Sequence, residues 1–203
     1  MPIYKYKKNL IAFIHIPKNA GKSIKEMLES KFSCIFFGYQ RPYIPNKVTQ
    51  QHYTYEELRK AFMHKLDIDK IYSFCVVRDP YDRIISEWKW QQQNKRFLDD
   101  SFEDFCKRVR QSLKTNKTYF DNHWRPQSDF ISDKINRIIK FEKFNEEIKK
   151  VFSDINLEWE REILVRNMTN KKNICHTQLT KDIITDIYKI DFENFEYNVK
   201  GNY

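Results

Sequence analysis

The stretch AFIHIPKNAGKSI, residues 12–24, limits what this chain can fold into more than any other part of the sequence. Residues 10–16 form a short apolar run that is typical of a buried strand, and Pro17 ends it. Gly21 allows a tight turn, and residues 23–31 have the apolar spacing of a helix. The stretch therefore predicts a strand that runs through a glycine turn directly into a helix.

The rest of the chain repeats this alternation. Further apolar, β-prone runs predict strands at residues 34–37, 71–77 and 137–141. Capping signals or helical spacing predict helices at 54–63, 81–93, from 101 onward, at 145–152 and at 180–188. The alternation predicts an α/β fold, with a central parallel sheet flanked by helices in a single domain spanning residues 1–203. Ligands of such sheets bind beyond the carboxyl ends of the strands.

The charge and the apolar content of the sequence limit which partners and which cellular compartment we expect. The chain has 37 Lys and Arg against 28 Asp and Glu, a net charge of +9, which favours an anionic partner such as a nucleotide or acidic polysaccharide. No run approaches the ~20 apolar residues of a membrane helix, and residues 10–16 are too short for a secretory signal. The cysteines form no C-x-x-C pair, and Cys34 and Cys75 lie in apolar runs typical of buried positions. We expect a cytoplasmic protein without stable membrane insertion.

The first predicted strand end has the composition of an anion site. The N–H groups in the first turn of a helix lack internal partners, and Lys18, Lys22 and Ser23 add further donors. Gly21-Lys22-Ser23 also matches the end of the ATP-binding pattern G-x-x-x-x-G-K-[ST], but Ile16 occupies the place of its first glycine. The alternative is an ordinary basic turn between a strand and a helix.

A second polar cluster, Arg78-Asp79-Pro80, follows the predicted strand at 71–77. The guanidinium of Arg78 is a rigid fork suited to phosphate, and Ser86 in the next helix offers a hydroxyl. The alternative is that Arg78 pairs with Asp79 or Asp82 to brace the turn, and that Ser86 is incidental. Together, the two strand ends can hold a nucleotide that carries two separated phosphate groups.

The two clusters carry a family resemblance. FIHIPKNAGKSI followed by VVRDPYDRIISEW resembles the two cofactor signatures of sulfotransferases, which use 3'-phosphoadenosine 5'-phosphosulfate (PAPS). The most similar branch is the glycan sulfotransferases related to the uronyl 2-O enzymes. Three later blocks, at 123–131, 138–148 and 179–197, also resemble this family, so the resemblance covers most of the chain. It implies a nucleotide-binding topology like that of P-loop NTPases.

The resemblance also implies roles for the matched positions. Lys18 would hold the 5'-phosphosulfate and stabilise the leaving oxygen, and Arg78 and Ser86 would hold the 3'-phosphate. The remaining cofactor contacts would come from Asn19, Ala20, Gly21, Lys22, Ser23, Lys172 and Asn173. Lys22 stands where the family has a small hydroxyl residue, so it either contacts phosphate or points to water. A transferred sulfuryl group carries less charge than a phosphoryl group, so we expect no metal requirement.

Transfer to a hydroxyl also needs a base, and histidine suits that role near neutral pH. The resemblance places a catalytic histidine at His52, in the loop before a capping box. His123 is the alternative base, or else it binds the acceptor together with Trp124 and Arg125. His15 falls inside the first predicted strand and is interpreted as structural.

Two other functions fit parts of the sequence. A P-loop kinase or NTPase would bind Mg²⁺-ATP at Gly21-Lys22-Ser23, but it needs the missing glycine at Ile16 and an acidic motif for the metal. A nucleic-acid-binding protein would use the net positive charge, but no motif of that class is present. The sequence therefore predicts sulfuryl transfer from PAPS, with PAP as product, to a hydroxyl of a carbohydrate, in particular an anionic glycan.

Overall fold

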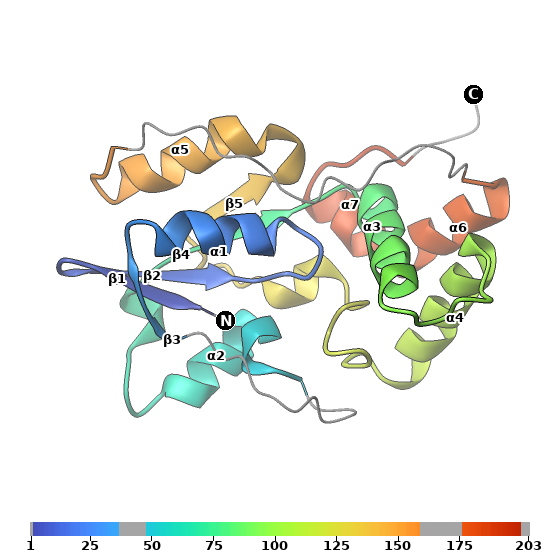
Figure 1. Cartoon of the computed structure of the whole chain (residues 1–203), viewed down its shortest axis with the longest axis horizontal. Coiled ribbons are helices and arrows are strands. Elements are labelled where there is room, and N and C mark those ends of the chain that lie inside the picture. Colours follow the sequence, from blue (N-terminus) through green and yellow to red (C-terminus); the bar gives the residue numbers. More distant parts are fainter. Residues whose placement is uncertain (1, 37–47, 159–175, 200–203) are drawn as a thin grey trace.

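A computed structural model of the chain describes residues 2–36, 48–158 and 176–199 (Figure 1). Its five strands form one sheet in the order β3-β1-β2-β4-β5. The strands are β1 (Ile3–Tyr6), β2 (Asn9–Ile14), β3 (Ser33–Phe36), β4 (Tyr72–Val77) and β5 (Arg137–Lys140). The helices are α1 (Gly21–Glu29), α2 (Tyr55–Phe62), α3 (Pro80–Gln93), α4 (Phe102–Thr115), α5 (Phe144–Asp154), α6 (Gln178–Ile187) and α7 (Lys189–Asn194).

The sheet is mixed, so the prediction of a parallel sheet is only partly right. β2, β4 and β5 run parallel, whereas β1 is antiparallel to both β2 and β3. β1 was not predicted, because its four residues, IYKY, include a lysine and give little apolar signal. A turn at Lys7, where φ is 53°, joins β1 directly to β2, and such a short connection allows only antiparallel pairing.

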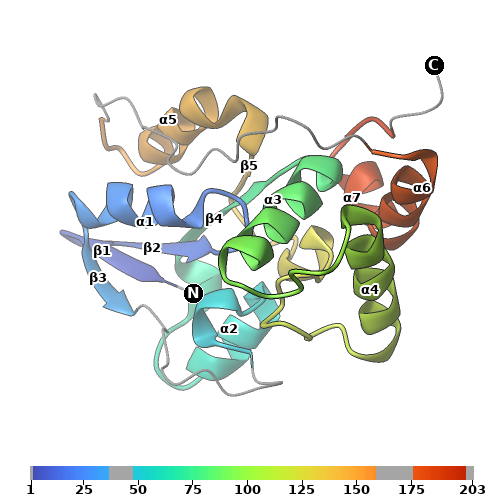
Figure 2. The ribbon, with the colours of Figure 1, turned by 45° about the vertical axis from the view of Figure 1, so that its right-hand side comes forward.

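Apolar clusters cover both faces of the sheet and extend beyond its end. α1 and α5 pack on one face and α2 on the other, as the alternating strand side chains require. A third cluster joins α3, α4, α6 and α7 beside the carboxyl ends of the parallel strands (Figure 2). The strand ends therefore lie at the junction between the sheet and this helical layer.

Local signals explain where the helices start. Thr54 and Glu57 form the capping box of α2, in which each side chain accepts a hydrogen bond from the other residue's backbone N–H. Asp79 caps α3 by accepting from the N–H groups of Tyr81 and Asp82, and Ser101 caps α4. These predicted starts are confirmed.

Cys75 is buried, as predicted, but Cys34 is exposed. Cys34 lies in β3, which pairs only with β1 and forms an edge of the sheet. The first three residues of this edge strand, Cys34 among them, are exposed, so the prediction for Cys34 is wrong. Among the described residues, no helix is both long enough and apolar enough to cross a membrane.

Candidate active site

The loop between β2 and α1 is the first candidate for anion binding. Two of its residues that are not glycine have left-handed backbone conformations, Lys18 with φ 70° and Ala20 with φ 61°. Ala20 provides no side-chain cap for α1, and the first turn of α1 contains no acidic residue. The first-turn N–H groups of α1 thus have the arrangement that binds anions at helix N-termini.

Gly21 is needed for a reason that the sequence did not reveal. We expected it to adopt a tight-turn conformation, but the left-handed residues are Lys18 and Ala20 instead. A Cβ atom added at Gly21 would lie 1.8 Å from Nε2 of His15. Gly21 therefore provides room for the His15 imidazole against the start of α1.

Gln127 connects this loop to the end of β4. Its Oε1 accepts hydrogen bonds from Asn19 Nδ2 at 2.7 Å and from the Arg78 N–H at 2.9 Å, and its Nε2 donates to the Arg78 carbonyl at 2.8 Å. Asn19 Nδ2 also donates to the carbonyl of Val76 at 2.7 Å. Asn19 is fully buried, and its side chain serves this network.

Arg78 is only 7% exposed, and its guanidinium lies against the loop. Nη1 donates to the carbonyl of Lys18 at 3.3 Å, and the guanidinium carbon lies 4.3 Å from the ring centroid of Phe141. Nε is buried without a hydrogen-bond partner among the described residues. Burial lowers the pKa of Arg78, and nearby carboxylates, chiefly Asp82, oppose this only in part. A buried cation with an unused hydrogen-bond donor is suited to bind an anionic ligand. This fits Arg78 better than the alternative in which it pairs with Asp79 or Asp82 to brace the turn.

Lys18 lies close to the same point. Its Nζ is 4.9 Å from the ring centroid of Trp90 on α3, which is a cation–π distance. Burial lowers the pKa of Lys18 to about 8; Arg78 also lowers it, whereas Glu87 opposes the change. The ammonium thus keeps its charge at neutral pH but titrates just above it.

Three histidines and a tryptophan form a continuous row of rings, which we call the histidine row. Ring centroids are 4.9 Å apart between His15 and His52 and between His52 and His123, and 4.8 Å apart between His123 and Trp90. Because Lys18 lies over Trp90 and His15 lies against Gly21, the row follows the anion loop along its length.

His52 is oriented by Asp121, a residue that the sequence analysis did not identify. Nδ1 of His52 lies 2.8 Å from Oδ2 of Asp121. Burial favours a raised pKa for Asp121, but hydrogen bonds from His52 and Thr49 outweigh it and leave the pKa below its ordinary value. An ionised carboxylate only accepts, so Nδ1 of His52 carries a proton and Nε2 keeps its lone pair. Burial lowers the pKa of His52 to about 4, although Asp121 opposes this, so the ring is neutral at pH 7.

His123 has a second carboxylate partner, Glu87 on α3, which the sequence analysis also missed. Nδ1 of His123 donates to Oε2 of Glu87 at 2.9 Å. Glu87 is 1% exposed; burial favours a higher pKa, but His123 and Lys18 lower it to about 2. Arg83, Glu87 and Gln91 recur every four residues on a buried face of α3. That stripe of polar residues was the signal that could have identified Glu87.

Arg83 holds the anion loop and the His123 segment together. Its Nε donates to the carbonyl of Pro17 at 3.3 Å, and its Nη2 donates to the carbonyls of His123 and Arg125 at 2.9 and 3.0 Å. The side chain is almost completely buried. Arg83 is therefore a positioning residue for both parts of the site.

The expected acceptor residues are only partly supported. Trp124 is 0% exposed and packs in the third apolar cluster, so the prediction that it lines the acceptor cleft is wrong. Its large indole fills the space between α3, α4 and α6. Arg125 pairs with Asp129 at 3.1 Å and with Glu57 at 3.4 Å, which already compensates its charge.

The remaining expected residues differ in their surroundings. Ser23 and Ser86 are buried, on α1 and α3 respectively, whereas Lys22 is exposed. Lys172 and Asn173 lie outside the described residues. Within the described ranges, His52, Asp121 and His123 are the one group whose potential metal-ligand atoms lie within 4.8 Å of one another. The hydrogen bond from His52 to Asp121 explains why these two side chains lie so close together, with the His123 imidazole beside them.

The comparisons with known proteins give one match. A family model described as "Sulfotransferase family" matches residues 3–198, which include both strand-end clusters and the whole histidine row. No curated protein and no solved structure matches the chain.

Proposed function

Because the chain belongs to the sulfotransferase family, we propose that it transfers a sulfuryl group from PAPS to a hydroxyl of an anionic glycan, with His52 as general base. The observation that carries the proposal is the position of His52. This neutral, carboxylate-oriented imidazole lies in the histidine row, which follows the loop that contains the half-buried Lys18 and that the buried Arg78 contacts from the end of β4.

The nucleotide fits the two anion-binding elements. Lys18 and the first-turn N–H groups of α1 would bind the 5'-phosphosulfate, and Arg78 would bind the 3'-phosphate through donors that include its unused Nε. Ser23, Ser86, Lys172 and Asn173 remain candidate contacts. In this arrangement the Lys18 ammonium also stabilises negative charge on the oxygen that leaves sulfur.

His52 would take the proton of the acceptor hydroxyl at Nε2 as the hydroxyl oxygen attacks sulfur. Asp121 holds the ring through Nδ1 and stabilises the imidazolium that forms. His123, held by Glu87, would donate or accept a hydrogen bond with the acceptor. Trp90 stacks with His123 and lies against the Lys18 ammonium and the Arg96 guanidinium, so Trp90 would position the lysine rather than pack on a sugar.

We expect PAP to stabilise the protein strongly. At about 100 times its dissociation constant, PAP should add about 2.7 kcal/mol to the free energy of unfolding. For a chain of this size, that corresponds to a rise in Tm of roughly 5–10 °C. AMP lacks the 3'-phosphate that Arg78 would bind, so it should give a much smaller rise. A thermal-shift series with both nucleotides measures the difference, and a strong shift with Mg²⁺-ATP but not with PAP would replace this proposal with a kinase or NTPase.

The acceptor is tested separately by an assay of transfer from labelled PAPS. We expect transfer to uronate-rich glycans to exceed transfer to neutral glycans, phenols and tyrosine peptides, because the net charge of +9 exceeds what one nucleotide needs. Transfer to the glycan should weaken as salt rises, since exposed charges are screened over ~10 Å at 0.1 M. Fast transfer to phenols or peptides with none to any glycan would contradict the acceptor proposal and leave the nucleotide proposal intact.

A further inference from the structure

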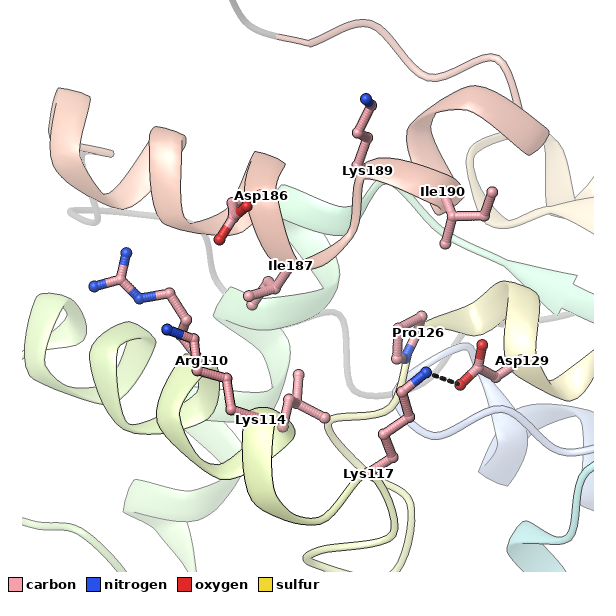
Figure 3. Close-up of a pocket in the computed structure, with 10 residues that line it drawn as sticks. Arg110, Lys114, Lys117, Pro126, Asp129, Asp186, Ile187, Lys189 and Ile190 are labelled. Atoms are coloured by element: carbon pink, nitrogen blue, oxygen red, sulfur yellow. Dashed lines mark ion pairs between the residues drawn. The ribbon is translucent and has the colours of Figure 1, made fainter.

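A groove with a cavity volume of about 360 Å³ lies between α4 and the corner where α6 meets α7 (Figure 3). This volume lies within the range of roughly 300–1,000 Å³ that is usual for ligand sites. The segment after His123 closes one side of the groove with Pro126 and Asp129. No residue that we assign to the nucleotide site lines it.

The charge around the groove is predominantly positive. Two carboxylates, Asp129 and Asp186, face four cationic side chains, which are Arg110, Lys114, Lys117 and Lys189. In Figure 3, Arg110 and Lys117 reach from the α4 side toward the opposite wall, and an ion pair is marked only between Lys117 and Asp129, at 3.8 Å. A spacing of four residues puts 110 and 114 on one stripe of α4, and Lys117 follows just beyond the end of this helix.

The cations on this stripe differ from their neighbours on α4. Lys107 is paired with Glu103 and Arg108 with Asp100, each at 2.7 Å. Arg110 and Lys114, in contrast, form no ion pair with any residue in the described parts of the chain. The unpaired cations of α4 are therefore the ones that line the groove, where they are available to an anionic ligand.

The groove also has an aliphatic surface, formed by Leu113, Ile187 and Ile190. Ile190 is 44% exposed, which is unusual for so large an apolar side chain. Aliphatic walls with cations at the rim suit a ligand with C–H faces and several negative groups, such as a chain of uronate or sulfated sugars. A groove suits a polymer strand better than a flat lipid surface.

A chain of ion pairs runs from the groove to Glu57 in the first turn of α2. Lys117 contacts Asp129, Asp129 contacts Arg125, and Arg125 contacts Glu57 at the start of α2. Glu57 belongs to the capping box that follows His52. The lining of the groove includes Pro126, three residues after His123, so a glycan whose reacting sugar lies beside His52 and His123 can continue along this segment to the groove.

We propose that this groove binds the part of an anionic glycan acceptor that extends beyond the reacting sugar, an inference that rests on the proposed function. The test uses the double variant Arg110→Glu, Lys114→Glu in the full chain. The probe is a fluorescein-labelled oligogalacturonate of ten residues, measured by anisotropy at about 50 mM salt with PAP present. We expect its affinity to fall roughly tenfold or more, because two attractive contacts become repulsive. The affinity of the corresponding unlabelled disaccharide, measured by competition with the probe, should be the same in the double variant as in the original protein, because a disaccharide at the histidines does not reach the groove.

The matched control is Lys149→Glu, Lys150→Glu on α5, which changes the net charge equally at two exposed lysines away from the groove (Figure 1). An equal loss of affinity in this control, or no loss in the groove variant, would overturn the inference. The rise in Tm with PAP is recorded for every protein, so an absent nucleotide response shows that the proposed function has failed whatever the probe does. Vesicles with about 30% phosphatidylserine form a further arm. If the groove variant loses vesicle binding but keeps probe binding, the groove binds membranes and the inference is wrong.

Discussion

Replacing His52 with alanine is expected to lower turnover by roughly 10²–10⁴-fold while the affinity for PAP stays within a few-fold. Loss of a positioned general base costs rates of this size, and His52 contacts Asp121 and its neighbouring rings rather than Lys18 or Arg78. Steady-state kinetics with labelled PAPS give the turnover, and the melting shift with PAP gives the binding.

His64→Ala is the matched control, because this histidine is exposed just beyond α2 and should leave both quantities unchanged. Asp121→Asn should also lower turnover, because an amide no longer fixes the tautomer of His52 as a carboxylate does. Near-full activity of His52→Ala together with inactivity of His123→Ala would transfer the role of base to His123.

The pH profile of kcat/KM gives an independent readout of the same assignment. As pH falls through about 4, His52 gains a proton and Nε2 can no longer accept one, so the acid side of the profile should decline there. As pH rises through about 8, Lys18 loses its charge and the nucleotide binds less tightly. His52→Ala should retain the alkaline decline and lose the acid one.

Gln127→Leu is expected to destabilise the folded state by about 3–5 kcal/mol. Leucine fills a similar volume, but it leaves the Arg78 N–H and carbonyl without their buried partner and removes one acceptor of Asn19. Each unsatisfied buried group costs about 1–3 kcal/mol, and the sum corresponds to a fall in Tm of roughly 6–20 °C. Calorimetry measures the fall, and titration with PAP should show weaker binding because both anion-binding elements depend on Gln127.

Gln93→Leu is a suitable comparison for this variant, because Gln93 is an exposed glutamine at the end of α3. It should change Tm by no more than about 2 °C. A similarly small change in Gln127→Leu would mean that the loop and the end of β4 hold their positions without this network.

Sequence patterns predicted the elements whose signals are local. The capping box at Thr54, the cap at Ser101 and the apolar runs of β2 and β4 depend on residues a few positions apart. β1 was not predicted because a four-residue strand that contains a lysine shows no clear alternation of apolar and polar residues. Its antiparallel pairing follows from the short turn to β2 rather than from composition. The three parallel strands were nevertheless predicted. The expectation that the ends of β2 and β4 lie close together therefore holds.

The candidate site likewise contains residues that local motifs identify and residues that no local motif identifies. Lys18, Arg78 and His52 lie within recognisable motifs, whereas their partners are distant in the chain. Asp121 is 69 residues from His52, and Gln127 is 108 residues from Asn19. No local pattern encodes contacts over such separations, because the sheet order and the packing of α3 create them. Trp124 was misassigned because its neighbours are polar, although its own indole is a core side chain.

The contact between Gly21 and His15 has a consequence for how this fold can diversify. A side chain at position 21 collides with the imidazole at position 15 in its present orientation, so a change at position 21 requires a change at position 15. A larger residue at 21 is compatible with the loop only if position 15 becomes smaller, and that second change removes the ring that packs on His52. Substitution in the loop is thereby linked to substitution beside the proposed base, and relatives of this chain should carry compensatory pairs at 15 and 21.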